Sequence, residues 1–415
     1  MRRPPPLLLA CLLLPLAPAC DDGPRSLAER LNAQPGFWFE ARPSSADAEQ
    51  MRVIAESGYA AGYVPAREAY GARVHDASAV EPGWNLYSSG HAPEAFLVDG
   101  EGREIHRWGL AWEDVPDVPP LEHPTQAAWR RVRLLEDGSL LAIVEGLALV
   151  CVDHRSRLRW VWPRGAHHDL DLDREGRVVV LTQRERLHPG LDTGTAVLED
   201  WVTTLTPDGE LVEELSLYDC LLASRWAAEL RAVASGGGDL LHTNALEVLD
   251  GSLADRHPAF AAGNLLVCFR ELDAVAVVDA RRRRVVWFVR GGWGAPHDPH
   301  LLADGGLLIF DNMGNEGYSR VMEIDAVTRS PRWTWQGERA EDFFSVFCGA
   351  ATRLPRGNTL VTESCNGRAF EVTPDGRVVW SFLSPHRAGE AGELVAALFE
   401  VQRLPPDTPL DWLRK

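Results

Sequence analysis

Three histidines of the sequence recur at one position relative to a predicted hairpin turn. His297 lies seven residues before the acidic turn residue Asp304, and His168 lies seven residues before Glu175. His242 begins the first strand of a longer hairpin in the same way. Imidazole can serve near neutral pH as a nucleophile, a general acid or base, or a metal ligand. The repeated position therefore predicts a site at which several histidines act together.

Other polar residues recur seven positions after each turn glycine, where the second strand of each hairpin ends. These residues are Glu145, Gln183, Arg270, Asn312 and Ser364. They place the guanidinium of Arg270 near the histidines, and such a planar, permanently charged group suits an oxyanion. The alternative is that these residues only line a wet channel, or that each histidine is satisfied by its own aspartate or by backbone groups.

The strands that would carry these residues follow a long repeat. From about residue 85, short β-rich runs alternate with Asp-Gly, Glu-Gly or Arg-Gly turns, and four such runs recur every 40 to 50 residues. This spacing is typical of the blades of a β-propeller, whose innermost strands run beside a central channel. We therefore expect His168, His242 and His297 to face one another. The fourth run often ends in a tryptophan: Trp160, Trp287, Trp333 and Trp380.

Both ends of the chain supply strands of one further blade. Residues 96–108 match the last strands of a blade, and residues 396–406 match the first strand. We therefore predict an all-β fold, a six-bladed propeller over residues 85–406 that both ends close, which removes a free sheet edge. Residues 216–234 interrupt the repeat with a helical period and predict one inserted amphipathic helix on a propeller face.

The first twenty residues predict export from the cytoplasm. MRRPPPLLLACLLLPLAPAC has a basic start, a short apolar run and small residues before a cysteine, which indicates a signal peptide over residues 1–20. The cysteine resembles that of a bacterial lipobox, so we expect a periplasmic or cell-envelope protein with a lipid anchor at Cys20; ordinary cleavage nearby is the alternative. Residues 21–84 are expected to form a linker and an arm with a helix at 45–59, and residues 407–415 a tail.

The charge and the lysine content exclude several classes of function. The formal net charge is -18 and the pI is near 5.2, so the average surface repels a phosphate backbone and nucleic acid is not an expected partner. Lys415 is the only lysine, which excludes a P-loop, a Schiff base and a lysine general base. Any anion must be held by arginine, histidine or backbone amides.

The five cysteines that follow the signal peptide are an odd number in a compartment that permits disulfides. A hairpin turn centred on Arg356 and Gly357 would place Cys348 directly opposite Cys365, within reach of a cross-strand bridge. We therefore predict a disulfide between Cys348 and Cys365, with two packed thiols as the alternative.

Several stretches resemble one known family. GARVHDASAVEPGWNLYSSGHAPEAFLVDGEGREIHRW, HHDLDLD, HTNALEV, FRELDAVAVVD and HDPHLLADGGLLIFDN are similar to stretches of the bacterial arylsulfate sulfotransferases, and the likeness extends over most of residues 70–400. The resemblance implies a six-bladed periplasmic propeller that moves a sulfuryl group from an aryl sulfate to a phenol through a sulfohistidine, independently of PAPS and without a cofactor. HDPH departs from the family's usual Gln-His-Thr-Ala type of context.

Carried over to this sequence, the resemblance assigns sulfate contacts to His242 and Asn244. It assigns a further active-site histidine to His168, with His167 as the alternative. Sulfuryl transfer needs donors for three anionic oxygens, and these side chains would supply them beside Arg270.

The resemblance also makes His297 the sulfurylated nucleophile and Arg270 the arginine that holds sulfuryl oxygens. A neutral imidazole can attack sulfur in line, oriented through its other nitrogen by a neighbouring acceptor such as Asp298. His168 could protonate the leaving oxygen and later deprotonate the acceptor, which predicts ping-pong kinetics. Asn312 ends the second strand of the same hairpin and is expected to bind substrate.

Two other functions are compatible with the same residues. His168, His242 and His297 could bind Zn²⁺ with one position open to water, as in a metal-dependent lyase or hydrolase. Arg270 in the same channel argues against this because a cation repels a metal ion, so no metal site is predicted. The other alternative is an envelope-anchored propeller that binds a ligand or a protein without turnover.

Overall fold

The computed structural model describes residues 62–414 except 67, 122–123, 192, 235–237, 339–341 and 390. All of these residues belong to one compact unit, Ala41–Lys415. The predicted signal peptide, Cys20 and the helix expected at 45–59 lie outside the described residues. None of the helices in the described ranges is long and apolar enough to cross a membrane.

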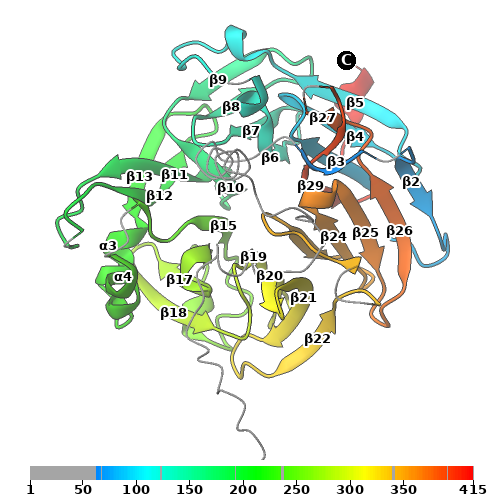
Figure 1. Cartoon of the computed structure of the whole chain (residues 1–415). Helices are drawn as coiled ribbons and strands as arrows, with labels where there is room; N and C mark the ends of the chain where they lie inside the picture. The colour runs from blue at the N-terminus through cyan, green and yellow to red at the C-terminus, as the bar shows by residue number, and fades with distance from the viewer. Residues whose placement is uncertain are drawn as a thin grey trace, which may run out of the picture. The chain divides into compact units, whose positions relative to one another are not determined.

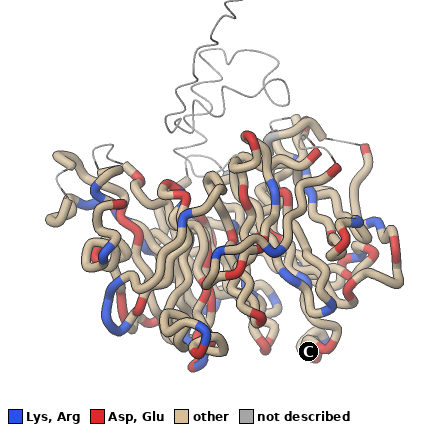
Figure 2. Tube along the Cα trace, turned by 90° about the horizontal axis from the view of Figure 1, so that it is seen from below, with Lys and Arg blue, Asp and Glu red and all other residues tan. Residues whose placement is uncertain are grey.

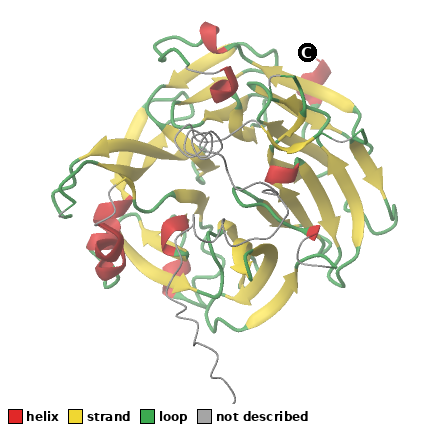
Figure 3. Cartoon of the chain, in the orientation of Figure 1, coloured by secondary structure: helices red, strands yellow, loops and turns green. Residues whose placement is uncertain are grey.

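Strands dominate the described chain, and most of them form six sheets of four or five strands around a common centre (Figures 1 and 3). From the centre outward, the first sheet consists of β29 (Leu398–Leu404), β3 (Trp84–Ser89), β4 (Glu94–Val98) and β5 (Glu104–Gly109). The second consists of β6 (Trp129–Leu134), β7 (Leu140–Val144), β8 (Ala148–Val152) and β9 (Leu158–Trp162). The third consists of β10 (Ala166–Leu172), β11 (Val178–Arg186), β12 (Val197–Leu205) and β13 (Leu211–Ser216), with β14 (Gly238–Asp239) beside β12. The fourth sheet consists of β15 (Thr243–Val248), β16 (Leu265–Phe269), β17 (Ala274–Asp279) and β18 (Arg284–Arg290). The fifth consists of β19 (His297–Leu301), β20 (Gly306–Asn315), β21 (Tyr318–Asp325) and β22 (Pro331–Trp335). The sixth consists of β23 (Ala350–Arg353), β24 (Thr359–Glu363), β25 (Arg368–Val372), β26 (Val378–Leu383) and β2 (Gly71–Val74). A small sheet joins β1 (Gly62–Pro65), β28 (Leu394–Ala396) and β27 (Arg387–Ala388).

The innermost strands make this arrangement a β-propeller. β6, β10, β15, β19, β23 and β29 contact one another in a closed ring, and each begins one of the six sheets (Figure 1). The sheet that contains β29 is closed by both ends of the described chain, because Leu404 of β29 pairs with Trp84 of β3. This confirms the expected fold class and the pairing of the two ends.

The second strand of each sheet is buried on both faces, which explains its continuous apolar sequence. In β7, Leu140, Ala142 and Val144 pack into one core cluster, whereas Leu141 and Ile143 pack into another together with residues of β11. Successive side chains of a strand point to opposite faces, so a strand between two neighbouring sheets has no solvent-facing side. Such layers hold the inner strands rigidly in place.

The segment before the predicted propeller is partly integrated into it. β2 pairs with β26 as a fifth, outermost strand, with Gly71 opposite Leu383 and Val74 opposite Trp380. The C-terminal segment also docks, since Trp412 in the 3₁₀ helix Asp411–Arg414 is buried among the aromatic rings of His106 and Trp108. The further 3₁₀ helices are Trp112–Asp114, Pro124–Ala127, Pro258–Phe260, Arg270–Leu272 and Ser364–Asn366.

The inserted segment forms two short helices, α3 (Leu217–Leu222) and α4 (Ala227–Val233), rather than the one helix predicted. Ser216 caps α3, because its side chain accepts a hydrogen bond from the backbone N–H of Asp219 at 3.0 Å. The Ser224 hydroxyl donates to the Leu221 carbonyl at 2.7 Å and accepts from the Trp226 N–H at 3.1 Å. These local bonds compete with the helical pattern and separate the two helices. α3 contacts β12 and β18, so it lies between two neighbouring sheets.

Cys348 and Cys365 are both buried thiols, which corrects the predicted disulfide. Ala350 pairs with Thr362 across β23 and β24, so the register differs by one residue from the one that would set the cysteines opposite each other. Moreover, Cys365 lies beyond β24, in a 3₁₀ helix, and its Sγ donates to the Phe347 carbonyl at 3.4 Å. A one-residue change of register moves side chains to the other face of a strand.

One guanidinium joins the innermost strands near the axis. Arg131 of β6 pairs through Nε with Asp169 of β10 at 3.0 Å, through one terminal nitrogen with Asp298 of β19 at 2.9 Å, and through the other with Glu400 of β29 at 2.6 Å. The free oxygens of two of these carboxylates accept backbone N–H groups of the two remaining sheets, from Leu246 at 2.8 Å and Ala351 at 3.0 Å. This axial network, defined by Arg131, Asp169, Asp298 and Glu400, therefore connects all six sheets.

Candidate active site

The backbone is irregular where the innermost strands that carry the candidate site residues begin. His168, His242 and Asp298 have positive φ values of 52°, 46° and 49°, the left-handed region that non-glycine residues rarely adopt. The register against the neighbouring strand shifts at His168 in β10 and at Asp298 in β19, and in β15 it shifts just after His242, between Thr243 and Ala245. A bulge re-aims the side chains beside it, and here it does so where the sequence places its histidines.

His297 is buried, and its protonation is fixed by its partners. Its Nδ1 lies 2.8 Å from Oδ1 of Asn312 and 3.1 Å from the Ala295 carbonyl oxygen. The amide nitrogen of Asn312 donates at 2.6 Å to the carbonyls of Ser345 and Cys348, so its oxygen must face the imidazole. Both partners of Nδ1 are therefore acceptors. Nδ1 carries the proton, and Nε2 carries a lone pair.

The surroundings of His297 keep its imidazole neutral. Burial lowers the pKa of His297 well below its usual range, and the positive charges of Arg270 and Arg130 lower it further. The bond to Asn312 acts in the opposite direction and does not offset them. A neutral imidazole with a lone pair can act as a nucleophile, and the nearby positive charges favour an anionic ligand.

Asp298 does not orient His297, contrary to our expectation. Its carboxylate binds Arg131 in the axial network and Nε2 of His300 at 3.3 Å. Despite burial, the charges of His300 and Arg131 hold the pKa of Asp298 below its usual range. The left-handed conformation of Asp298 turns its side chain toward the axis, and Asn312 takes the orienting role.

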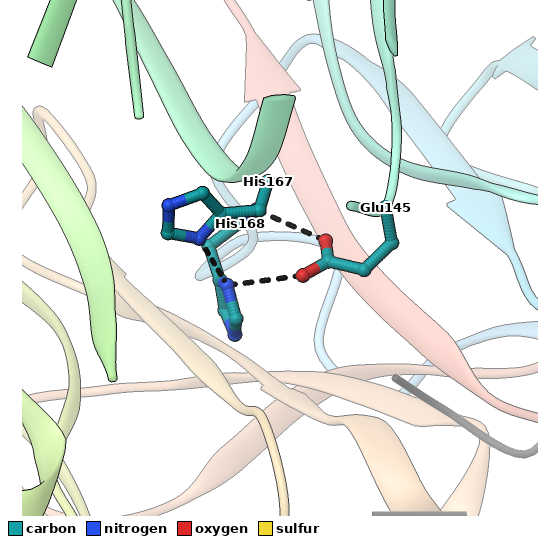
Figure 4. Close-up of side chains that lie close together, drawn as sticks. All are labelled: Glu145, His167 and His168. Carbon is teal, nitrogen blue, oxygen red and sulfur yellow. Dashed lines mark hydrogen bonds and ion pairs between the residues drawn. The ribbon is translucent and has the colours of Figure 1, made fainter. Parts of the chain in front are cut away.

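His168 contacts the carboxylate of Glu145, and the ring of its sequence neighbour His167 contacts His168 (Figure 4). Nδ1 of His168 lies 3.0 Å from Oε1 of Glu145 and 2.8 Å from Nδ1 of His167. Burial, followed by the charge of His242, lowers the pKa of His168 well below its usual range. Burial also lowers the pKa of His167, whose Nε2 lies 3.6 Å from Oδ1 of Asp200.

His242 stands beside His168, as the repeat predicted. The two rings meet edge to face with centroids 4.8 Å apart. Asp239 anchors His242 by accepting from its backbone N–H at 2.8 Å and binding its Nδ1 at 2.6 Å. Although burial alone would raise it, the pKa of Asp239 is held at about 2 by the charge of His242 and its hydrogen bonds.

Asn244 contacts the chain next to His297. Its amide nitrogen donates to the Pro296 carbonyl at 2.9 Å, directly before His297. Its Oδ1 is buried and has no hydrogen-bond partner among the described residues. The amide therefore supports the start of β19 and keeps an acceptor atom in the site.

Two buried arginines bring positive charge to the histidines. Arg270 begins the 3₁₀ helix after β16 and pairs with Glu271. Arg130 of β6 lies over the ring of Phe399 at 5.0 Å, and its charge lowers the pKa of both His168 and His297. Arg130 was not among the predicted site residues. It occupies the position in the first repeat that histidine occupies in three others, and that was the signal for it.

The three aligned histidines do not gather as a metal-ligand set. Among the described residues, two groups have ligand atoms within 4.8 Å of one another: Glu145, His167 and His168, and a second group of His188, Glu199 and Asp219. The first lies in the candidate site and could hold a metal ion through two imidazole nitrogens and one carboxylate oxygen.

Comparison with known proteins gives one match to a family. The model of the family described as arylsulfotransferase (ASST) matches residues 132–385. No protein among the curated sequences matches the chain.

Several solved structures are similar in fold at low identity. A protein of unknown function from Bacteroides caccae is 12% identical with a TM-score of 0.49, covering 77% of this chain and 98% of that one. A streptogramin B lyase is 11% identical with a TM-score of 0.45, covering 81% and 98% of the two chains. The WD40 β-propeller domain of Doa1 is 12% identical with a TM-score of 0.43, covering 77% and 85%.

Proposed function

This chain belongs to the arylsulfotransferase family, and from that premise we propose that it moves a sulfuryl group from an aryl sulfate to a phenol through a covalent intermediate on His297. The observation that carries this proposal is the protonation of His297, whose two acceptors at Nδ1 leave the lone pair on Nε2. The proposed reaction uses an aryl sulfate ester in place of PAPS and needs no cofactor.

In the first step, Nε2 of His297 attacks sulfur, the N–S bond forms and the S–O bond to the aryl group breaks. Arg270 and Arg130 hold the sulfuryl oxygens, since guanidinium groups bind oxyanions with paired hydrogen bonds. His242 and Asn244 are proposed as further sulfate contacts.

In the second step, the oxygen of the phenolic acceptor attacks the same sulfur as the N–S bond breaks. His168 gives a proton to the departing phenolate in the first step and takes the acceptor's proton in the second. The ring is neutral at rest, so the proton that it gives in the first step is one that it has taken up at Nε2, from a preceding acceptor or from water. Donor and acceptor use one channel in turn, which predicts ping-pong kinetics.

We also propose that the protein works in the bacterial periplasm or cell envelope and is held there by a lipid on Cys20. The MRRPPPLLLACLLLPLAPAC stretch supports this proposal. The partners are then small aryl sulfates and phenols, with the membrane as anchoring surface only.

The test is to incubate the full-length protein with 4-nitrophenyl sulfate, record its intact mass, and then add phenol. We expect the mass of one added sulfuryl group, lost on addition of phenol, and no adduct in His297→Ala. His75→Ala is the control, because His75 is exposed next to the outermost strand β2 and should form the adduct normally.

An adduct that persists in His297→Ala would mean that another residue is the nucleophile. No adduct together with zinc in elemental analysis would favour a metal site at Glu145, His167 and His168. Absence of both adduct and metal would favour a propeller that binds without turnover.

A further inference from the structure

Glu145 contacts His168 at two atoms from a neighbouring sheet, through one backbone hydrogen bond and one contact with the ring (Figure 4). The residue follows directly after β7, whereas His168 belongs to β10. Oε2 of Glu145 accepts the backbone N–H of His168 at 3.0 Å, and Oε1 lies 3.0 Å from Nδ1 of the same residue. The carboxylate thus fixes both the left-handed backbone of His168, with φ at 52°, and the orientation of its ring.

These contacts determine where the protons of the two adjacent histidines lie. An ionised carboxylate only accepts hydrogen bonds, so Nδ1 of His168 must carry the proton that faces Glu145. Nδ1 of His167, at 2.8 Å, must then accept from the same N–H. The proton of His167 is left on Nε2, whose 3.6 Å distance to Oδ1 of Asp200 is too long for a hydrogen bond. This pattern satisfies both close contacts of His168 Nδ1, and it places the lone pair of His168 on Nε2.

We propose that Glu145 is a positioning residue that holds His168 as the Nδ1–H tautomer, so that His168 Nε2 exchanges protons with the phenolic oxygens of donor and acceptor. This proposal rests on the proposed sulfuryl transfer. In the donor step, His168 that has taken up a proton at Nε2, from the preceding acceptor or from water, gives this proton to the aryl oxygen as the S–O bond breaks. In the acceptor step, Nε2 takes the phenol's proton as the new O–S bond forms and the N–S bond to His297 breaks.

The carboxylate also stabilises the charge that this cycle creates. When Nε2 takes up a proton, His168 becomes an imidazolium whose Nδ1–H already points at Glu145, which forms an ion pair in a buried site. Other groups oppose that charge, and burial together with His242 and Arg130 keeps the resting ring neutral. The charged and titratable groups that act on His168 are Glu145, His167, His242, Arg130 and Asp239, and His168 in turn acts on His297.

The test compares two donors in Glu145→Gln, which keeps the shape but presents an N–H where Nδ1 needs an acceptor. 4-Nitrophenolate leaves without a proton, so sulfurylation by 4-nitrophenyl sulfate should change by about threefold or less. Phenolate is a far stronger base, so sulfurylation by phenyl sulfate should fall about 100-fold or more, the usual contribution of a general acid. Glu175→Gln, in an exposed turn, should affect neither donor.

A conservative variant guards against misfolding, and ¹⁵N shifts provide a readout that does not depend on activity. Glu145→Asp retains an acceptor and should recover part of the phenyl sulfate rate, even if Glu145→Gln folds poorly. Imidazole ¹⁵N shifts should report the Nδ1–H tautomer of His168 in the wild type and its loss in Glu145→Gln, with His168→Ala to assign the signal.

Several outcomes would overturn the proposal. Equal slowing of both donors in Glu145→Gln would mean a purely structural role, and an unchanged phenyl sulfate rate would mean no role. An Nε2–H tautomer in the wild type, or a metal ion bound at Glu145, would also contradict it. If the wild type forms no sulfuryl adduct with either donor, the proposed function fails, and the ¹⁵N shifts still decide the tautomer.

Discussion

At the residue scale, the protonation state of His297 depends on contacts and charges that act on its pKa in opposite directions. Burial and the charges of Arg270 and Arg130 disfavour its protonation, while its bond to Asn312 favours it. Because the pKa is lowered, His297 takes up a proton at Nε2 only at a pH below the ordinary histidine pKa of about 6.5. The lowered pKa also reduces the free energy of unfolding below about pH 6.5, because the unfolded chain then binds a proton that the folded chain does not bind.

The rate of sulfurylation by 4-nitrophenyl sulfate should therefore stay level as the pH falls through about 6.5 and decline only at lower pH. Replacing Arg130 by methionine removes one of the charges that lower the pKa of His297, so the decline should move to higher pH. The pH at which the rate halves is the quantity to compare, with Arg133→Met on the same strand as the control. An unmoved decline in Arg130→Met would contradict the role given to its charge.

At the element scale, tryptophans on the fourth strands of three sheets bond to the neighbouring sheet. The indole N–H of Trp160 in β9 donates to the Pro207 carbonyl at 3.0 Å, and that of Trp333 in β22 donates to Pro374 at 3.0 Å. Trp380 in β26 donates to Gly100 at 2.8 Å. In each case the acceptor lies in the turn between the third and fourth strands of the neighbouring sheet, which explains the tryptophan at these three positions.

Gly209 should be more sensitive to substitution than Gly176, although both are turn glycines with left-handed φ values of 84° and 74°. A Cβ on Gly209 would lie 2.6 Å from the indole of Trp160, whereas one on Gly176 meets nothing within 4 Å. Gly176→Ala should cost about 1–2 kcal/mol for backbone strain alone. Gly209→Ala should cost about 1–3 kcal/mol more because of overpacking. Thermal denaturation of both variants measures the difference, and equal losses would rule out the indole contact as its cause.

At the scale of the whole molecule, two kinds of interaction hold the sheets together, one between their faces and one at their inner strands. Apolar layers pack between neighbouring sheets, and the axial network of Arg131, Asp169, Asp298 and Glu400 joins their inner strands. Burial, with the charge of Asp298, raises the pKa of Asp169 to about 7 against the opposing effect of Arg131. Elsewhere acidic and basic residues are interspersed along the trace (Figure 2). The net charge of -18 therefore does not exclude locally positive sites.

Arg131→Met should destabilise the fold strongly, because it leaves the buried carboxylates of Asp169 and Asp298 and the largely covered one of Glu400 without their shared cation. Breaking a buried ion pair costs about 3–5 kcal/mol. Arg133→Met on the same strand removes a partly exposed contact with Asp171 at 3.7 Å and should cost about 0–1 kcal/mol. Denaturant unfolding followed by tryptophan fluorescence compares the two variants. Similar midpoints would show that the axial network contributes little.

The sequence by itself determined the local and repetitive features of this protein. Alternating strands, turn glycines and the outer tryptophans follow from short-range patterns, so the propeller and the pairing of residues near both chain ends could be predicted. The recurring position also identified His168, His242 and His297, and the stretches around them indicated the family.

Only the tertiary structure decided which groups these histidines contact. Bulges and left-handed residues redirect side chains by an amount that spacing does not encode, so Asp298 turned to the axis and Asn312 took its place. Glu145 reached His168 from another sheet, and Cys348 missed Cys365 by one residue of register. Contacts between sheets depend on where separate strands meet in space, and that is set by the packing of the whole propeller.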